Sequence, residues 1–126
     1  MSAFLLDTDC AIYAMLGTHP HLRARLAECE PGEVAISAIS FAEIVMGENL
    51  GHPPDREAIE DFVSVVPIVP FDEAAARAYS NLPFRRASFD RLIAAHALAI
   101  GATVVTNNEA DFADVPRLKI ENWTIR

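Results

Sequence analysis

Acidic side chains stand at four places in the sequence where a charge is unusual. Asp7 follows a short apolar run, Glu43 is the only charged residue between positions 38 and 47, Asp90 opens an amphipathic segment, and Asp111 follows another apolar run. A carboxylate in apolar surroundings is unfavourable unless it is paired or bound to a metal. Oxygen ligands without a His or Cys cluster favour Mg²⁺ or Mn²⁺. Such a cation site requires that the fold bring these acids together.

Each acid also has a purely structural interpretation. Asp7 and Asp90 stand where helices are expected to begin, and an acid at a helix start is stabilised by backbone amides and the helix dipole. Ser40 and Glu43 have the spacing of a capping box, in which the Glu reaches back to the Ser amide. Asp111 alone is an ordinary loop acid. The residues themselves leave both interpretations open.

Short apolar segments alternate with helical patterns along the chain. Strands are expected at residues 3–6, 34–36, 65–69, 102–105 and 119–120. Helices are expected at 10–16, 20–29, 40–50, 53–64, 72–81 and 88–100. This alternation is typical of an α/β fold with a mainly parallel sheet. Because ligands of such folds bind beyond the carboxyl ends of the strands, the acids that follow strands gain interest.

Length and composition limit the class of protein. The 126 residues are 52% hydrophobic, which excludes disorder and predicts a single domain spanning 1–126. No stretch approaches the roughly 20 apolar residues of a membrane span, and no export signal is evident. Cys10 and Cys29 fit no zinc pattern and are expected to pack as reduced thiols, which indicates a cytoplasmic protein. His96 is expected to be a core or interface residue.

The charge balance is unfavourable for a nucleic-acid surface. Lys plus Arg is 10 and Asp plus Glu is 18, a net charge of −8. The best local basic group is Arg85 and Arg86, with Arg77 and Arg91 nearby in the sequence. These side chains could contact RNA phosphates, or they could simply be solvated.

Four motifs in order resemble those of a PIN domain, and most of all the VapC toxins of bacterial toxin–antitoxin modules. They are Leu5-Leu6-Asp7-Thr8, Ser37-x-x-Ser40-x-x-Glu43-Ile44, Phe89-Asp90-Arg91-Leu92-Ile93-Ala94-Ala95-His96-Ala97, and Val104-Val105-Thr106-Asn107-Asn108 followed by Asp111-Phe112. The resemblance covers nearly the whole chain. It implies a three-layer α/β/α fold and a metal-dependent endoribonuclease.

The resemblance also implies roles for particular residues. Its acids correspond to Asp7, Glu43, Asp90 and Asp111, of which Asp7 and Asp90 would bind Mg²⁺, or Mn²⁺, directly. Glu43 and Asp111 would hold a second ion or orient water around the first. The polar residues at the end of the fourth strand would support them by positioning a water, ligand or phosphate oxygen. These are Thr106, Asn107 and Asn108.

The expected partners follow from the same resemblance. They are RNA, often a tRNA or rRNA loop, a small VapB-type antitoxin that inhibits the enzyme, and a second copy in a homodimer. The antitoxin surface would lie near Ile12, Tyr13, Leu16 and Ile44.

Two departures from the family pattern affect the site. Asp9 stands where relatives often have Asn, which adds an acid. In some relatives an acid stands where this chain has Asn108, so that either Asp111 replaces it or the site uses three acids.

Other functions remain as alternatives. Asp7-x-Asp9 with Thr106 would suit a haloacid-dehalogenase-like phosphatase, and Asp72 is the one candidate phosphorylation site of a receiver domain. A PIN-like scaffold that only binds RNA or a partner, without catalysis, is the third alternative.

Overall fold

The computed structural model describes residues 2–83 and 88–125, and five strands in it form one parallel sheet. The sheet order is β3-β2-β1-β4-β5, and every neighbouring pair is parallel. The strands are β1 (Phe4–Leu6), β2 (Val34–Ser37), β3 (Ile68–Val69), β4 (Thr103–Val105) and β5 (Ile120–Glu121). The expected parallel α/β sheet is therefore confirmed.

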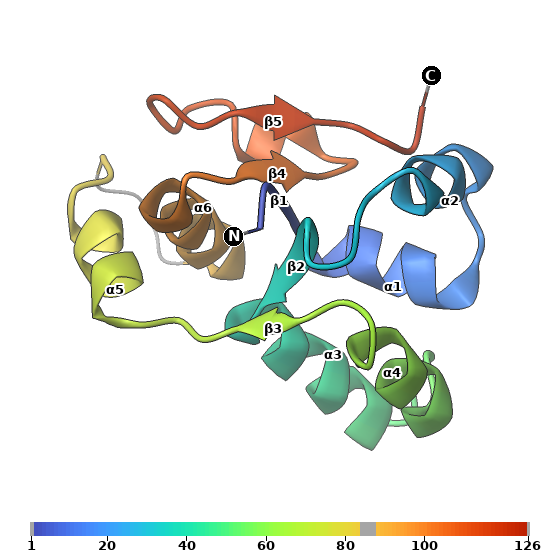
Figure 1. The fold of residues 1–126 in the computed structure, drawn as a ribbon. Coiled ribbons are helices and arrows are strands. Elements are labelled where there is room, and N and C mark those ends of the chain that lie inside the picture. The colour runs from blue at the N-terminus through green and yellow to red at the C-terminus, as the bar shows by residue number, and fades with distance from the viewer. Residues whose placement is uncertain (1, 84–87, 126) are drawn as a thin grey trace.

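Helices cover both faces of this sheet (Figure 1). They are α1 (Thr8–Leu16), α2 (Pro20–Ala27), α3 (Ala38–Asn49), α4 (Arg56–Val63), α5 (Glu73–Ser80) and α6 (Phe89–Ile100). Figure 1 shows α5 and α6 on one side of the sheet and α1, α2 and α4 on the other. These are the three layers that the resemblance implied.

Alternation along the central strands divides the core in two. Leu6, Ile36 and Val105 belong to a cluster with residues of α1 to α4, whereas their neighbours in the strands belong to a cluster with α6. Because successive strand side chains point to opposite faces, the short apolar segments cover the sheet on both sides. The three strands that carry the site, β1, β2 and β4, are thus buried at their carboxyl ends.

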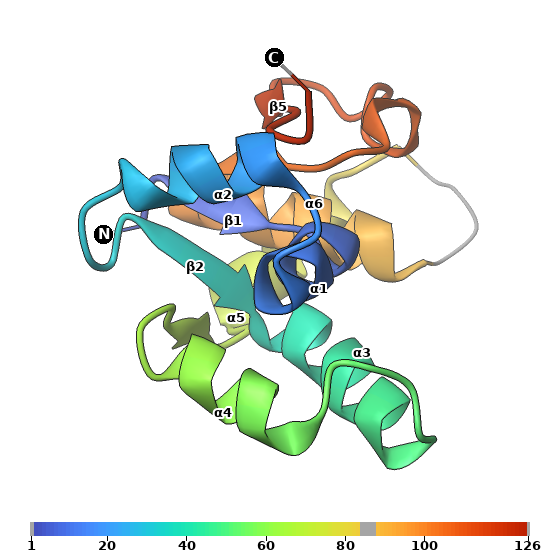
Figure 2. The same cartoon turned by 90° about the vertical axis from the view of Figure 1, so that its right-hand side faces the viewer.

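β1 and β2 run directly into α1 and α3. The helix α6 precedes β4 in the chain, and its first turn lies at the same end of the sheet. The register pairs Leu6 with Ile36 and with Val105, so the three strands end at the same level. Figure 2 shows this end of the sheet together with the first turns of α1, α3 and α6. Side chains that follow these strands therefore meet at one edge.

Three expected helix starts differ from the structure by two or three residues, and the first is α1, which begins at Thr8 and not at residue 10. The helix expected from Ser40 begins at Ala38, because Ser37 is its cap and accepts from the Ile39 amide at 3.0 Å. The capping box of Ser40 and Glu43 is therefore wrong. The helix expected from residue 53 begins at Arg56 after the cap residue Asp55, because an aspartate acceptor ends the preceding proline-containing loop.

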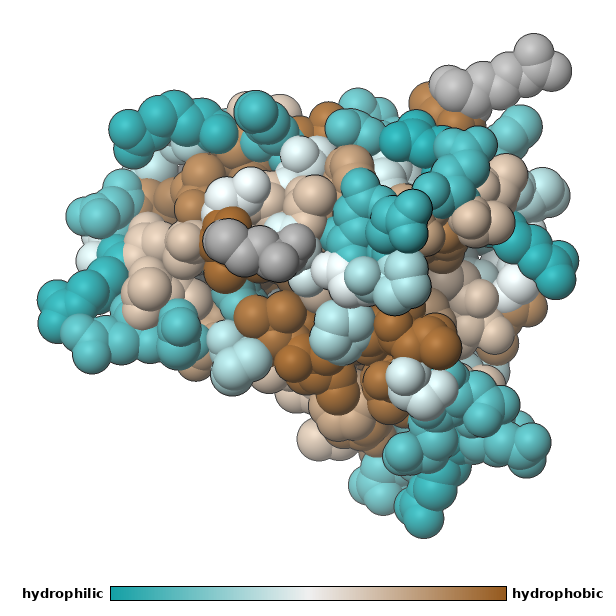
Figure 3. All heavy atoms as spheres, in the orientation of Figure 1, coloured by the Kyte–Doolittle hydropathy of each residue, from teal (hydrophilic) through white to brown (hydrophobic). Residues whose placement is uncertain are grey.

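The third strand is shorter than expected and lies at the edge of the sheet. It comprises only Ile68 and Val69, since Pro67 cannot donate a ladder hydrogen bond. Hydrophobic side chains gather on the face around β3 (Figure 3), where Val65 and Ile68 are exposed. Within residues 2–83 and 88–125, no helix has the length and hydropathy to cross a membrane.

Candidate active site

Asp7 is buried at the junction between β1 and α1. Only 5% of it is exposed, and one of its carboxylate oxygens accepts from the Cys10 amide at 2.9 Å as the cap of α1. Burial raises the pKa of Asp7, the charge of Asp9 adds to this, and hydrogen bonds from Thr106 and Cys10 oppose it. The carboxylate is therefore both a helix cap and a buried charge at the end of the sheet, so the two interpretations of Asp7 are compatible.

Glu43 is held against α1 from the neighbouring helix. The hydroxyl of Thr8 donates to its Oε1 at 2.5 Å, which joins residues 35 positions apart. Burial raises the pKa of Glu43, the charges of Asp9 and Asp7 raise it further, and only the Thr8 hydrogen bond lowers it. Glu43 thus faces the Asp7 side of the site and does not cap its own helix.

Asp90 and Asp111 interact directly. Asp90 lies in the first turn of α6, whose cap is Ser88, and Asp111 ends the short 3₁₀ turn Glu109–Asp111. Burial, the charge of Asp111 and a hydrogen bond between the two carboxyl groups raise the pKa of Asp90 to about 6. The charges of Asp7 and Glu43 contribute to the same shift, so the other three acids all act on Asp90.

The fourth acidic position is also defined by this geometry. The side-chain amide of Asn108 donates to Asp111 Oδ2 at 2.7 Å, so the amide orients the carboxylate that reaches Asp90. A hollow of about 380 Å³ opens between Asp90 and Asp111. Asp111 is therefore the acid that lies next to Asp90, and Asn108 contacts it through its side-chain amide.

These four side chains form a cluster of like charge, the carboxylate cluster (Asp7, Glu43, Asp90 and Asp111). In the described part of the chain, every charged neighbour that shifts the pKa of Asp7, Glu43 or Asp90 is another carboxyl group. At about 5 Å and an effective dielectric constant of about 20, a pair of such charges repels by about 3 kcal/mol. A bound cation would remove this repulsion.

A hard divalent cation fits the chemistry of the cluster. Its donors are all oxygens, which Mg²⁺ and Mn²⁺ prefer. Among residues 2–83 and 88–125, no three Asp, Glu, His or Cys side chains already converge as ligands of one ion. Mg²⁺ does not require such a cage, since it usually binds through one or two carboxylates and keeps several waters.

The polar residues after β4 support the cluster in different ways. Thr106 is fully buried and donates to Asp7, and its Oγ1 accepts from the Asn108 amide at 3.0 Å. Asn107 is exposed, and its side-chain amide donates to the Tyr13 hydroxyl at 3.2 Å. Thr106 and Asn108 are therefore tied to the acids, whereas Asn107 is tied to α1.

Thr8 is the site residue whose role the sequence did not reveal. It was part of the Asp7 motif and a possible helix cap, but its structural partner is Glu43. No local pattern links two residues so far apart in the chain, so only the packing of α1 on α3 identifies the contact.

The basic residues expected to contact RNA divide into two groups. Arg85 and Arg86 lie outside the described residues. The expectation for Arg91 is wrong, because its guanidinium is buried and binds Asp114 Oδ2 at 3.1 Å and the Pro83 carbonyl at 2.6 Å. Arg77 is paired with Glu73 at 2.6 Å on the surface of α5. Arg77 and Arg91 were expected near the substrate only because they are close to Arg85 and Arg86 in the sequence.

Three other expectations can be compared with the structure. His96 is fully buried, with Nδ1 at 2.8 Å from Ser37 Oγ, as expected for a core histidine. Cys10 is buried, and burial followed by the Asp7 charge raises its pKa, which suits a packing residue. Asp72 caps α5 by accepting from the Ala75 amide at 3.0 Å. A capping role accounts for Asp72 without phosphorylation.

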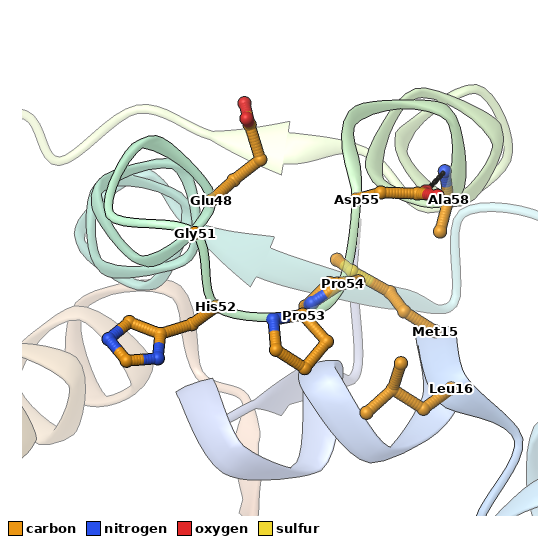
Figure 4. Close-up of a pocket in the computed structure, with 9 residues that line it drawn as sticks. All are labelled: Met15, Leu16, Glu48, Gly51, His52, Pro53, Pro54, Asp55 and Ala58. Carbon is orange, nitrogen blue, oxygen red and sulfur yellow. Dashed lines mark hydrogen bonds between the residues drawn. The ribbon is translucent and has the colours of Figure 1, made fainter.

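A separate pocket lies away from the acids. It has a volume of about 610 Å³ between the end of α1 and the connection from α3 to α4, where Met15, Leu16 and Pro53 form its wall (Figure 4). Leu16 is exposed, as are Met46 and Leu50 on α3. Ile44, which was expected on a partner surface, is buried in the core, so that part of the expectation is wrong.

Comparisons with known proteins agree with this fold and identify its family. The PIN domain model matches residues 4–118. The tRNA(fMet)-specific endonuclease VapC of Shigella flexneri is 31% identical over 98% of this chain and 100% of its own length.

Solved structures agree as well. VapBC of Salmonella typhimurium bound to DNA superposes with a TM-score of 0.86 at 29% identity, covering 98% of this chain and 99% of that one. VapBC2 of Rickettsia felis, bound to a DNA fragment from its promoter, gives a TM-score of 0.81 at 29% identity, covering 96% and 98%. The chain therefore belongs to the PIN-domain family and, within it, to the VapC ribonucleases.

Proposed function

We propose that residues 1–126 form one domain that hydrolyses phosphodiester bonds in RNA with a divalent cation, Mg²⁺ or in its place Mn²⁺. The observation that carries this proposal is the carboxylate cluster, in which four acids repel one another at the carboxyl end of a parallel sheet. PIN-domain ribonucleases are generally dependent on a divalent metal, and the cluster has the donor chemistry for one. A non-catalytic scaffold would have no need of this repulsion.

Asp7 and Asp90 are the proposed direct ligands. Asp7 directly follows β1 and Asp90 lies in the first turn of α6, and the charge of Asp7 is felt at Asp90. When bound there, the cation supplies an activated water and stabilises charge on the attacked phosphate. The backbone amide of Cys10 and the hydroxyl of Thr106 hold Asp7 in the ionised form that binding requires.

Glu43 and Asp111 have proposed orienting roles. Thr8 fixes Glu43 on one side of the cluster, and Asn108 fixes Asp111 on the other. Asp111 can accept hydrogen bonds from water in the hollow that it lines, Glu43 can orient water on the Asp7 side of the cluster, and either can take part in holding a second ion. Single-stranded RNA could place its phosphate at the open side between Asp90 and Asp111.

The proposed substrate and partners follow from relatives with known names. A relative is named as a tRNA(fMet)-specific endonuclease, so we propose tRNA or rRNA as the substrate. Solved relatives are complexes of VapC with VapB, and we propose a VapB-type antitoxin that contacts the exposed Leu16, Met46 and Leu50. A homodimer acting in the cytoplasm completes the proposal.

Cleavage of total bacterial RNA tests the function directly. The antitoxin-free protein should make discrete cuts in Mg²⁺ that EDTA abolishes, and Asp7→Ala should make none. Sequencing the new RNA ends would identify the substrate. A folded protein that binds Mg²⁺ but cuts no cellular RNA would contradict the proposal and favour the scaffold.

A further inference from the structure

Four of the seven Lys and Arg side chains among the described residues have a carboxylate partner, which reduces what they can offer to RNA phosphates. Four arginines lie beside carboxylates, at 3.3 Å for Arg25 and Glu121, 3.7 Å for Arg56 and Glu48, 2.6 Å for Arg77 and Glu73, and 3.1 Å for Arg91 and Asp114. The whole chain also has a net charge of −8. Phosphate contacts usually dominate affinity for nucleic acids. An RNA-binding protein of this composition needs another source of affinity, and stacking of unpaired bases on aromatic rings is one.

An aromatic pair stands at the junction between α1 and α2. The rings of Tyr13, in α1, and His19, the cap residue of α2, are stacked with centroids 3.9 Å apart and planes inclined by 21°. Both residues are half-buried. Tyr13 packs against the hydrophobic core, so His19 provides the outer ring of the pair.

The pair is fixed in position by hydrogen bonds at both rings. Asn107 donates to the Tyr13 hydroxyl at 3.2 Å, and Thr18 Oγ1 lies 2.8 Å from His19 Nδ1. The backbone makes the turn tight, since the Tyr13 carbonyl accepts from the amide of Gly17, whose φ of 68° suits glycine. Rings held in this way lose little conformational freedom when a base stacks on them.

The same contacts connect the pair to the proposed catalytic edge. Asn107 follows Thr106, whose hydroxyl binds Asp7, and the Asn107 backbone contacts the Cys10 thiol next to Asp7. The Tyr13 hydroxyl is therefore linked through the adjacent residues Asn107 and Thr106 to Asp7, a proposed metal ligand. A nucleotide adjacent to the attacked phosphate could reach the pair.

We propose that the Tyr13–His19 pair is a stacking subsite for an unpaired nucleobase of the RNA substrate, with the base resting on the His19 ring. This inference rests on the proposed function, because it names how the same site holds its substrate. Stacking tolerates any base, so the subsite contributes affinity and register without reading sequence.

The test separates base stacking from phosphate binding. Two fluorescein-labelled probes are used, a 12-nucleotide oligoadenylate RNA and a 12-nucleotide abasic RNA of the same charge. Fluorescence anisotropy is measured with the Asp90→Asn protein, so that cleavage does not interfere. We expect about 10-fold tighter binding of the oligoadenylate, as stacking of a single base can provide.

Matched substitutions at His19 test the residue itself. His19→Phe keeps an aromatic face and should retain the preference for oligoadenylate, whereas His19→Leu should lose it while binding abasic RNA equally well. Thermal unfolding of both variants checks the alternative that the pair only holds the α1–α2 turn. Equal preference in the Leu and Phe variants, with both folded, would overturn the proposal.

Further outcomes distinguish this inference from the proposed function. Wild-type protein that cuts RNA but binds both probes equally would overturn the subsite and leave the nuclease intact. Preference for oligoadenylate without any cleavage by wild-type protein would overturn the nuclease and leave the subsite. If His19→Leu keeps the preference but loses binding of a VapB-type antitoxin, the pair belongs to the partner interface and the proposal is wrong.

Discussion

Asp90 and Arg91 are neighbours at the start of α6, yet their charges have opposite surroundings. Burial, together with the neighbouring carboxylates of Asp111, Asp7 and Glu43, raises the pKa of Asp90 to about 6. Arg91 has a side chain only 8% exposed, and it binds both Asp114 and the Pro83 carbonyl. The protein thus surrounds the Asp90 carboxylate with like charge, whereas it gives the Arg91 guanidinium two oxygen acceptors.

The difference separates charges that hold the fold from charges that await a ligand. A buried guanidinium with ideal partners stabilises the loop and turn that it joins, and it has little capacity left for RNA. A group of like charges weakens the fold and persists where something else binds it. The carboxylate cluster and the Arg91 ion pair therefore predict opposite results on substitution.

The largest expected effect is the loss of cleavage on neutralising Asp90 or Asp7. Asp90→Asn and Asp7→Asn should each lower the cleavage rate by at least ~1,000-fold, in the range seen when a direct catalytic contact is lost. Asn keeps a side-chain oxygen for the Asp7 cap, and repulsion in the cluster falls, so the melting temperature should stay level or rise. Initial cleavage rates and thermal unfolding measure both. The control is Asp61→Asn on α4, which removes one exposed charge, and near-wild-type cleavage by Asp90→Asn would contradict the assignment.

Arg91→Met should have the reverse profile. Removing the buried guanidinium leaves its partners without their donor, so the unfolding free energy should fall by about 3 kcal/mol. Urea titration measures this loss, and Arg77→Met is the matched control because its pair with Glu73 is exposed at 76% and 77%. That control should change stability by no more than about 0.5 kcal/mol. A stable Arg91→Met protein that no longer binds RNA would contradict the assignment, because Arg91 would then serve RNA binding and not the fold.

Divalent cation should stabilise the carboxylate cluster selectively. If Mg²⁺ binds with a Kd of about 1 mM, a concentration of about 10 mM adds about 1.4 kcal/mol to the folded state. The melting temperature of the wild-type protein should then rise by roughly 5 °C, and that of Asp90→Asn much less. Sodium chloride at matched ionic strength is the control for screening. An equal rise in both proteins would place the cation elsewhere.

Thr8→Val should have a smaller effect on cleavage. The substitution keeps the shape of the side chain and removes the hydroxyl that donates to Glu43. Loss of such an orienting hydrogen bond typically lowers activity about 10-fold, with a stability change near 1 kcal/mol. Thr8→Ser retains a hydroxyl and should restore most of the cleavage rate. Unchanged cleavage in Thr8→Val would mean that Glu43 needs no positioning.

The sequence could predict the site where local rules place the residues. Asp7 follows a buried strand and Asp90 stands in the first turn of a helix, and both positions depend on a few neighbouring residues. The parallel order of the strands then brings them to one edge. Ser37 and Ser40 are both good caps, and sequence alone could not decide between them, because the end of β2 fixes where α3 begins.

The remaining features depend on contacts between distant residues. Thr8 meets Glu43, and Arg91 meets Asp114, because helices and loops pack in three dimensions. Sequence proximity placed Arg91 beside the RNA path, but a long flexible side chain can turn to either side of its helix. Spacing in the sequence therefore identified acids that act on one another in the structure. It did not predict that the Arg91 guanidinium is paired with Asp114.

The smallest expected effect concerns His96, a buried titratable group outside the carboxylate cluster. Burial lowers its pKa from the ordinary 6.5, opposed only in part by the Asp72 charge, so the unfolded chain binds a proton more readily than the folded chain. The contribution of neutral His96 to the unfolding free energy is therefore fully present above pH 6.5. It is lost as the pH falls from there through the folded-state pKa. Asp7, Glu43 and Asp90 have raised pKa values and act in the opposite direction, since the folded chain then binds the extra proton.

Comparison of variants isolates the histidine from those acids. Between about pH 7.5 and about pH 5, wild-type protein should lose more unfolding free energy than His96→Gln, measured by urea titration. His21→Gln, at an exposed histidine, should follow the wild type. Because all three proteins keep the same four acids, the carboxylate contribution cancels in the differences. Identical curves for His96→Gln and wild type would show that the buried imidazole accepts its proton as easily as a free one.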